Sequence, residues 1–117
     1  LDGKVYAIDA DSGRELWEEP FDAGSPIVAS PILVGDSLVV AGESGNVYVI
    51  NSKTGVGERI KNPEDANKPT IGALVRAPLC AYEGTVYIHA QDNCLYALDI
   101  DKGRISWRLP LSVKQES

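Results

Sequence analysis

One phrase is written three times in this chain, and the repetition constrains the fold more than any other feature. The copies are GKVYAIDADSGRELW at 3–17, GNVYVINSKTGVGER at 45–59 and NCLYALDIDKGRISW at 93–107. They align without internal gaps, and three positions recur in each: Tyr6, Tyr48 and Tyr96; Asp9, Asn51 and Asp99; Gly13, Gly55 and Gly103. The tyrosines are spaced by 42 and 48 residues. A period of this length indicates a repeat architecture.

A second phrase precedes the later two copies, as ASPILVGDSLVVAGES at 29–44 and RAPLCAYEGTVYIHAQD at 76–92. Both phrases consist of short β-branched and aromatic runs bounded by Gly, Asp, Asn and Ser, which is typical of strands joined by tight turns. The pattern predicts ten strands, at 4–9, 14–19, 27–34, 38–43, 47–51, 57–61, 74–82, 86–91, 94–99 and 104–109.

Both faces of these strands are apolar. Val47 and Val49 point one way, whereas Tyr48 and Ile50 point the other. Strands that are dry on both faces indicate a sheet packed between other sheets. We therefore predict an all-β fold of four-stranded antiparallel β-propeller blades, about two and a half of them. The expected parts are a partial blade at 1–24, a blade at 25–62, a polar insertion at 61–72 and a blade at 73–110.

The motif D-x-D-x-G-R-x-x-W follows the third strand in two copies, at 9–17 and 99–107. Its Asp and Gly predict a chain reversal, and its Trp is large enough to cover a neighbouring blade. The middle copy has Val56 in place of the Arg and Arg59 in place of the Trp. We expect the motif residues to be structural, with the tyrosines and tryptophans packing between blades: Tyr6, Asp9, Gly13, Trp17, Tyr48, Gly55, Tyr96, Asp99, Gly103 and Trp107.

On these residues the chain resembles the PQQ-like (quinoprotein-type) β-propeller repeat family, whose blades carry Y-A-L-D-x-x-T-G-x-x-x-W. Such repeats occur in outer-membrane assembly lipoproteins, in quinoprotein dehydrogenases, and in sensor or accessory domains of larger enzymes. The resemblance implies a non-catalytic, protein-binding scaffold in the cell envelope, on the periplasmic or extracytoplasmic side. The alternatives are a fragment of a PQQ-dependent dehydrogenase and an accessory propeller domain of a multidomain enzyme.

Ten strands are fewer than a closed propeller needs, so we expect a piece of a longer protein. Its partners would be the remaining blades, a second copy meeting its open blade faces and edges, or another protein. A net charge of −6 argues against nucleic acid, and no apolar run is long enough for a membrane span. No signal peptide is visible at the N-terminus, where the sequence enters a repeat directly.

Candidates for chemistry are few, and we expect neither a bound cofactor nor a catalytic group. The resemblance to quinoprotein dehydrogenases would require an adjacent Cys-Cys pair, which this sequence lacks, and Glu43 and Gln91 are the nearest candidates for axial ligands. Cys80 and Cys94 lie too far apart in the predicted sheet for a disulfide and are expected to be buried free thiols. His89 lacks companions for a metal site. The polar insertion is either a plain connection or a binding loop.

Overall fold

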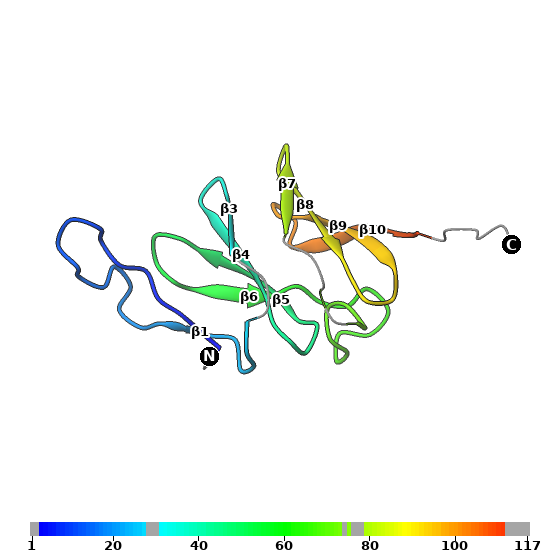
Figure 1. Cartoon of the computed structure of the whole chain (residues 1–117), viewed down its shortest axis with the longest axis horizontal. Coiled ribbons are helices and arrows are strands. Elements are labelled where there is room, and N and C mark those ends of the chain that lie inside the picture. Colours follow the sequence, from blue (N-terminus) through cyan, green and yellow to red (C-terminus); the bar gives the residue numbers. More distant parts are fainter. Residues whose placement is uncertain (1–2, 28–30, 74, 76–78, 112–117) are drawn as a thin grey trace, which may run out of the picture.

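The computed structural model describes residues 3–27, 31–73, 75 and 79–111. These residues form three antiparallel sheets, which follow one another along the 59 Å length of the molecule (Figure 1). The first blade contains β1 (Lys4–Val5) and β2 (Phe21–Asp22). The second blade contains β3 (Ile32–Val34), β4 (Ser37–Ala41), β5 (Val47–Asn51) and β6 (Gly57–Arg59). The third blade contains β7 (Cys80–Tyr82), β8 (Thr85–His89), β9 (Cys94–Asp99) and β10 (Arg104–Pro110).

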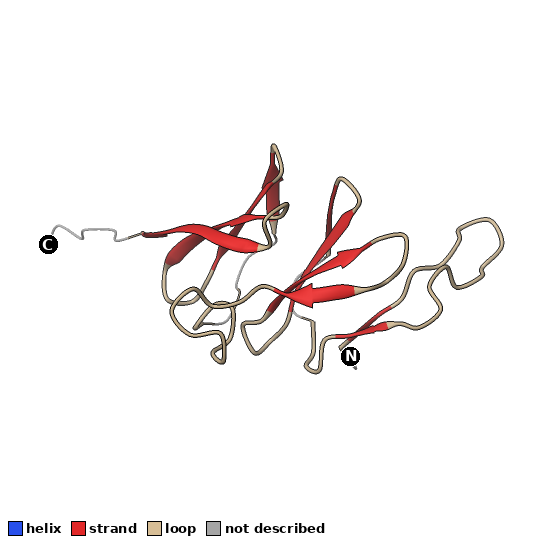
Figure 2. Cartoon of the chain, turned by 180° about the vertical axis from the view of Figure 1, so that it is seen from behind, coloured by secondary structure: helices blue, strands red, loops and turns tan. Residues whose placement is uncertain are grey.

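The second and third blades are built in the same way, with each strand paired to its neighbour in sequence. Figure 2 shows strands and loops throughout, and none of the described residues is in a helix. Accordingly, no helix long and apolar enough to cross a membrane is found in the described part of the chain. The expectation of an all-β chain of antiparallel blades is confirmed for these residues.

The strand boundaries agree best where the repeat phrase is strongest. The predicted strands 47–51 and 94–99 have those bounds in the structure. The predicted strand at 14–19 is wrong, because Glu15 forms only an isolated bridge with Ile8, and the strand that pairs with β1 is β2. In this segment the side chain of Trp17 packs in the contact with the second blade, where its indole N–H donates to the Ser52 carbonyl. Parts of the predicted strands 27–34 and 74–82 lie outside the described residues.

The second blade is buried on both faces. Val39 and Val47 belong to the larger core, which lies between the second and third blades. Val40 and Ile50 belong to a smaller core shared with the first blade. All four side chains are fully buried. The apolar composition of both faces is therefore explained by packing between sheets, as the sequence predicted.

The polar insertion at 61–72 ends in two buried residues. The Thr70 hydroxyl donates to the carbonyl of Ile60 and accepts the N–H of Val47 at 3.1 Å. Ile71 packs in the larger core, and its N–H donates to the Gly45 carbonyl at 2.9 Å. The insertion is thus anchored to the second blade at its C-terminal end, immediately before the chain crosses to the third blade.

Candidate interaction surfaces

The contact between the first and second blades is centred on one tryptophan. Trp17 is 5% exposed, and its indole N–H donates to the carbonyl of Ser52 at 2.7 Å. Its ring covers Gly55, where an added Cβ would lie only 2.6 Å from the indole Cδ2 atom. A glycine is needed here both for this close approach and for its positive φ of 80°. The indole therefore holds the turn of one blade against the next.

Aromatic rings support the same contact further along the sheets. Phe21 and Tyr48 meet edge to face with ring centroids 5.2 Å apart, an arrangement that aromatic pairs favour. The Tyr48 hydroxyl donates to the carbonyl of Ala23 at 2.8 Å. Tyr48 thus bridges the second blade to the first through both its ring and its hydroxyl group.

The turns of the repeat phrase are closed by an Asp or Asn side chain. The N–H groups of Ser12 and Asp11 donate to Asp9 Oδ1 at 3.1 and 2.8 Å, and these bonds hold the pKa of the exposed Asp9 carboxyl below its usual value. Asn51 accepts from the amides two and three residues later, and Asp99 from the amide three residues later. The glycines that follow have φ values of 72° at Gly13, 80° at Gly55 and 64° at Gly103. The carboxylates of Asp9 and Asp99 therefore accept hydrogen bonds from backbone amides of their own turns.

The three repeat tyrosines have different surroundings. Tyr6 is 50% exposed on the side of the first blade where the structure describes no sheet, so the expectation that it packs between blades stays a prediction. Tyr96 is 5% exposed and belongs to the larger core. Its hydroxyl donates to the carboxylate of Asp92. Burial, the hydrogen bond to Asp92 and the negative charge of that carboxylate all raise the pKa of Tyr96.

The outward face of the third blade carries exposed apolar and aromatic side chains. In the ladder, Cys80 pairs with Tyr87, Tyr87 with Ala97, and Ala97 with Trp107, so these four residues lie on one face. Leu109 shares this face through its pairing with Leu95. We call this surface the open face; its members are Cys80, Tyr82, Tyr87, His89, Leu95, Ala97, Trp107 and Leu109.

Trp107 belongs to the open face and is 45% exposed. Trp107 faces away from the second blade, on a side where the structure describes no further sheet, so the expectation that it covers a neighbouring blade stays a prediction. Its ring packs against Tyr87 of its own blade, with centroids 6.0 Å apart. Tyr82 is 66% and Leu109 50% exposed on the same face. The strand alternation in the sequence already places these residues together, but it does not show which face of the blade is covered.

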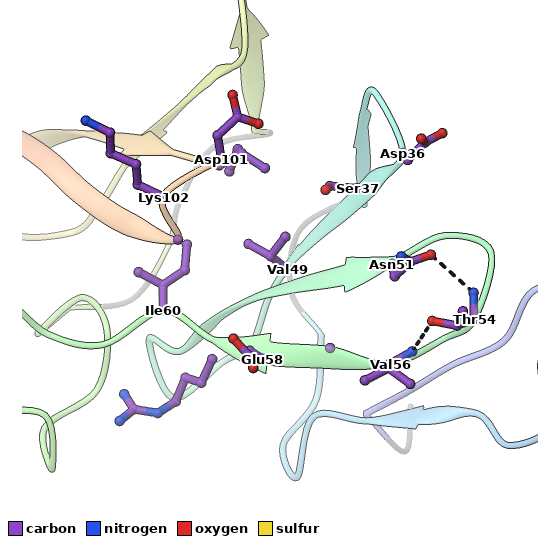
Figure 3. Close-up of a pocket in the computed structure, with 14 residues that line it drawn as sticks. Asp36, Ser37, Val49, Asn51, Thr54, Val56, Glu58, Ile60, Asp101 and Lys102 are labelled. Carbon is purple, nitrogen blue, oxygen red and sulfur yellow. Dashed lines mark hydrogen bonds between the residues drawn. The ribbon is translucent and has the colours of Figure 1, made fainter.

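The contact between the second and third blades differs from the first one. It has a large apolar core, but no indole covers the turn glycine Gly103. A cavity of about 570 Å³ lies here, lined by apolar side chains of Val49, Ile60 and Ile100 and by the bare Gly103 turn. Figure 3 shows Val49 and Ile60 of the second blade facing the turn of the third blade that carries Asp101 and Lys102. We call this space the rim cavity.

Strand register explains why the rim cavity is not filled. In the third blade the β9–β10 pairing shifts between Ile105 and Trp107, which places Trp107 opposite Ala97. The second blade pairs without such a shift, so that Glu58 stands opposite Val49, the counterpart of Ala97. Arg59, which aligns with the tryptophans in sequence, stands opposite Tyr48 instead. Sequence alignment missed Glu58 because a one-residue shift in a ladder leaves no mark on residue spacing.

The described residues offer little for metal or cofactor chemistry. They contain no group of three His, Cys, Asp or Glu side chains arranged to hold a metal ion. Cys80 and Cys94 are both free, which confirms that they form no disulfide with each other, but Cys80 is exposed on the open face rather than buried as expected. His89 lies 3.2 Å from Asn93 through its Nε2 atom. Glu43 and Gln91 are exposed just beyond the ends of β4 and β8.

Comparison with known proteins gives the relatives of this chain. A segment of outer membrane protein assembly factor BamB from Moranella endobia is 29% identical over 121 residues, and one of the same factor from Yersinia pestis is 25% identical over 120 residues. The matches cover 96% and 93% of this chain but only 29% and 28% of those proteins, so the chain spans about three tenths of their length. A lanthanide-dependent methanol dehydrogenase from Methylacidiphilum fumariolicum is 34% identical over 58 residues, which are 47% of this chain and 9% of that enzyme.

Solved structures share the fold. The crystal structure of BamB from Moraxella catarrhalis matches with a TM-score of 0.74 over 98% of this chain and 34% of that one, at 23% identity. A quinohemoprotein alcohol dehydrogenase from Pseudomonas putida matches with a TM-score of 0.54 over 85% of this chain and 15% of that one, at 22% identity. The fold is thus that of the β-propeller blades predicted from the repeats. Residues 1–116 match the family described as outer membrane protein assembly factor BamB, and the chain therefore belongs to this family of PQQ-like repeat proteins.

Proposed function

We propose that this chain is a non-catalytic, protein-binding segment of an envelope β-propeller of the BamB type. The observation that carries the proposal is the open face of the third blade. Its counterpart on the second blade, the surface that meets the third blade, is buried in a continuous core, whereas Trp107, Tyr82 and Leu109 remain largely exposed. Exposed apolar surface of this kind marks a protein contact.

The occupant we assign to the open face is another blade of the same repeat type, from the rest of a propeller or from a second copy. The first contact in this chain shows the chemistry, since Trp17 covers a turn glycine and donates to a carbonyl of the next blade. Trp107 is directed away from the second blade, as its pairing with Ala97 requires. A further blade with a turn glycine would complete the same contact and bury the ring.

The dehydrogenase relative supports one alternative, a segment of a quinoprotein enzyme. The serine/threonine-protein kinase AfsK of Streptomyces griseus, 28% identical over 133 residues, supports another, a propeller attached to a larger enzyme. In the described residues, the Asp side chains of the repeat turns are engaged by backbone amides. This favours the scaffold over a site in which such carboxylates act on a substrate or bind a cofactor.

A segment exchange tests the proposal. The chain would replace the aligned segment of the Yersinia pestis relative, and outer-membrane protein levels would be measured in a strain that lacks its own factor. We expect the chimera to restore those levels. A chimera that is folded, as judged by circular dichroism and a cooperative thermal transition, but leaves the levels of the deletion strain unchanged would contradict the proposal.

A further inference from the structure

The two contacts between blades differ at the turn glycine of the repeat. This difference leaves the rim cavity open beside Gly103. Gly55 is buried beneath the Trp17 ring. Gly103 has a similar backbone, with φ of 64°, but no heavy atom comes within 4 Å of the place where its Cβ would be. The same turn is therefore covered by an indole at one contact and bare at the next.

We propose that the rim cavity is a binding site for a tryptophan side chain supplied by a partner polypeptide. The indole would rest on Gly103 as Trp17 rests on Gly55, between the turn of the third blade and the strands of the second. This inference rests on the proposed function, because it names the kind of side chain by which a protein partner would engage this scaffold.

The size and lining of the cavity suit an indole. Its volume of about 570 Å³ lies within the range of about 300–1,000 Å³ that is usual for small-ligand pockets. Val49, Ile60 and Ile100 give it an apolar wall, and Ile60 and Ile100 are already buried at its inner side. An indole would bury its ring against this wall while presenting a single N–H group to the polar rim.

The charged side chains at the edge of the rim cavity determine which residues can flank the partner's tryptophan. Asp36, Glu58 and Asp101 contribute three carboxylates around the opening, against the single ammonium group of Lys102. Arg59 also lines the cavity, but its guanidinium group donates to the carbonyls of Ala66 and Lys68 in the insertion. These hydrogen bonds hold its charge at the insertion. The balance of charge favours basic residues beside the tryptophan, and the carboxylates can accept its N–H.

The chain does not fill this site from within. The position opposite Val49, which a tryptophan takes in the third blade, holds the exposed Glu58. A carboxylate at this position does not supply the apolar ring that would close the cavity, so the site is left for a partner's side chain. The structure thus has one contact closed by its own tryptophan and one that accepts a tryptophan in trans.

Nuclear magnetic resonance on the 117-residue chain tests the inference with blocked tripeptides as probes. We expect acetyl-Lys-Trp-Lys-amide to shift the amide signals of Lys102 and Gly103, with the amide of Gly24, which does not line the cavity, as an internal reference that does not move. Acetyl-Lys-Ala-Lys-amide, which has the same charge, should bind at least about tenfold more weakly, the factor that corresponds to 1.4 kcal/mol. Nuclear Overhauser contacts from the indole protons to the methyl groups of Val49 and Ile60 should locate the ring.

A filling variant provides the matched control. Glu58→Trp places an indole of the chain's own in the cavity, and we expect it to abolish the peptide-dependent shifts and to raise the melting temperature. Glu43→Trp adds an indole at an exposed position away from the cavity and should leave peptide binding unchanged. Should Glu58→Trp fail to fold, the Overhauser contacts in the unmodified chain decide the question.

Three results would overturn the inference. They are equal affinity for the two tripeptides, indole contacts on the open face in place of the rim cavity, or unchanged binding in folded Glu58→Trp. None of them bears on the segment exchange, so a chimera that restores outer-membrane protein levels without tripeptide binding would reject only this inference. A chimera that fails while the tripeptide binds would reject the proposed function and leave the tryptophan site standing.

Discussion

Replacing Trp17 with alanine should cost this chain far more stability than the same change at Trp107. Burying a Trp removes about 150–250 Å² from water, which at about 25 cal/mol/Å² gives roughly 4–6 kcal/mol as an upper bound for the 5%-exposed Trp17. Measured Trp→Ala losses of about 3–5 kcal/mol agree. Trp107 is 45% exposed, so about half of that area is at stake and the loss should be about 2 kcal/mol.

The loss at Trp17 should be concentrated in the first blade. This blade touches the rest of the molecule through the smaller core, which contains Trp17 itself, Val40 and Ile50. The larger core does not include Trp17, so the third blade should be little affected. In a chain whose blades contact only their neighbours, one global unfolding energy is not a sufficient readout.

Native-state amide hydrogen exchange resolves the blades separately. The opening free energy at Val5 and Ala23 should fall by about 3–5 kcal/mol in Trp17→Ala, or to zero if the native value is smaller, while that at Ile88 changes by less than about 0.5 kcal/mol. Trp17→Phe keeps a ring but loses the N–H donor to Ser52, so the opening free energy at Val5 and Ala23 should fall by about 1–2 kcal/mol, less than in Trp17→Ala. A loss below about 1 kcal/mol in Trp17→Ala, or equal losses for Trp17→Ala and Trp107→Ala, would refute the reasoning.

Three further changes test the turns and the larger core. Because the pKa of Asp9 is lowered in the folded chain, its carboxylate adds stability above the unfolded pKa of 3.8, and this stability is lost as the pH falls through the folded pKa. Asp9→Asn should keep the turn, as Asn51 does, and should abolish the acid dependence of the nuclear magnetic resonance shifts of the Asp11 and Ser12 amides. The raised pKa of Tyr96 means that the unfolded chain ionises first, so stability should fall above about pH 10, and Asp92→Asn should lower the pH at which this phenol ionises, as followed by ultraviolet absorbance. Thr70→Val leaves two buried backbone groups unpaired and should cost about 1–3 kcal/mol by urea titration, whereas Thr70→Ser should cost less.

Local sequence predicted much of the fold because the repeat marks the same turns in each copy. An Asp or Asn followed by a Gly four residues later identifies the reversal, and alternation between the two faces identifies the buried strands on either side. This is why β5 and β9 have the predicted bounds. The family followed from the same residues, since Tyr, Asp, Gly and Trp at fixed offsets are specific to it.

The sequence did not reveal features that depend on contacts between blades. Trp17 and Trp107 occupy the same place in the phrase, but one has a neighbouring blade and the other has none in the described structure. The rim cavity depends on a register shift between Ile105 and Trp107 that is absent near Glu58. Burial of Thr70 within a polar insertion was likewise hidden, because its partners are backbone groups. Register and neighbouring sheets are set by the three-dimensional packing rather than by local residue patterns.

The central claim is that the open face of the third blade binds another blade, and sedimentation equilibrium of the isolated chain tests it most directly. We predict reversible, concentration-dependent association that Trp107→Glu weakens and that Asn67→Glu, which adds the same charge to the exposed insertion, does not. A chain that remains monomeric up to about 1 mM, or that associates equally in both variants, would contradict the claim.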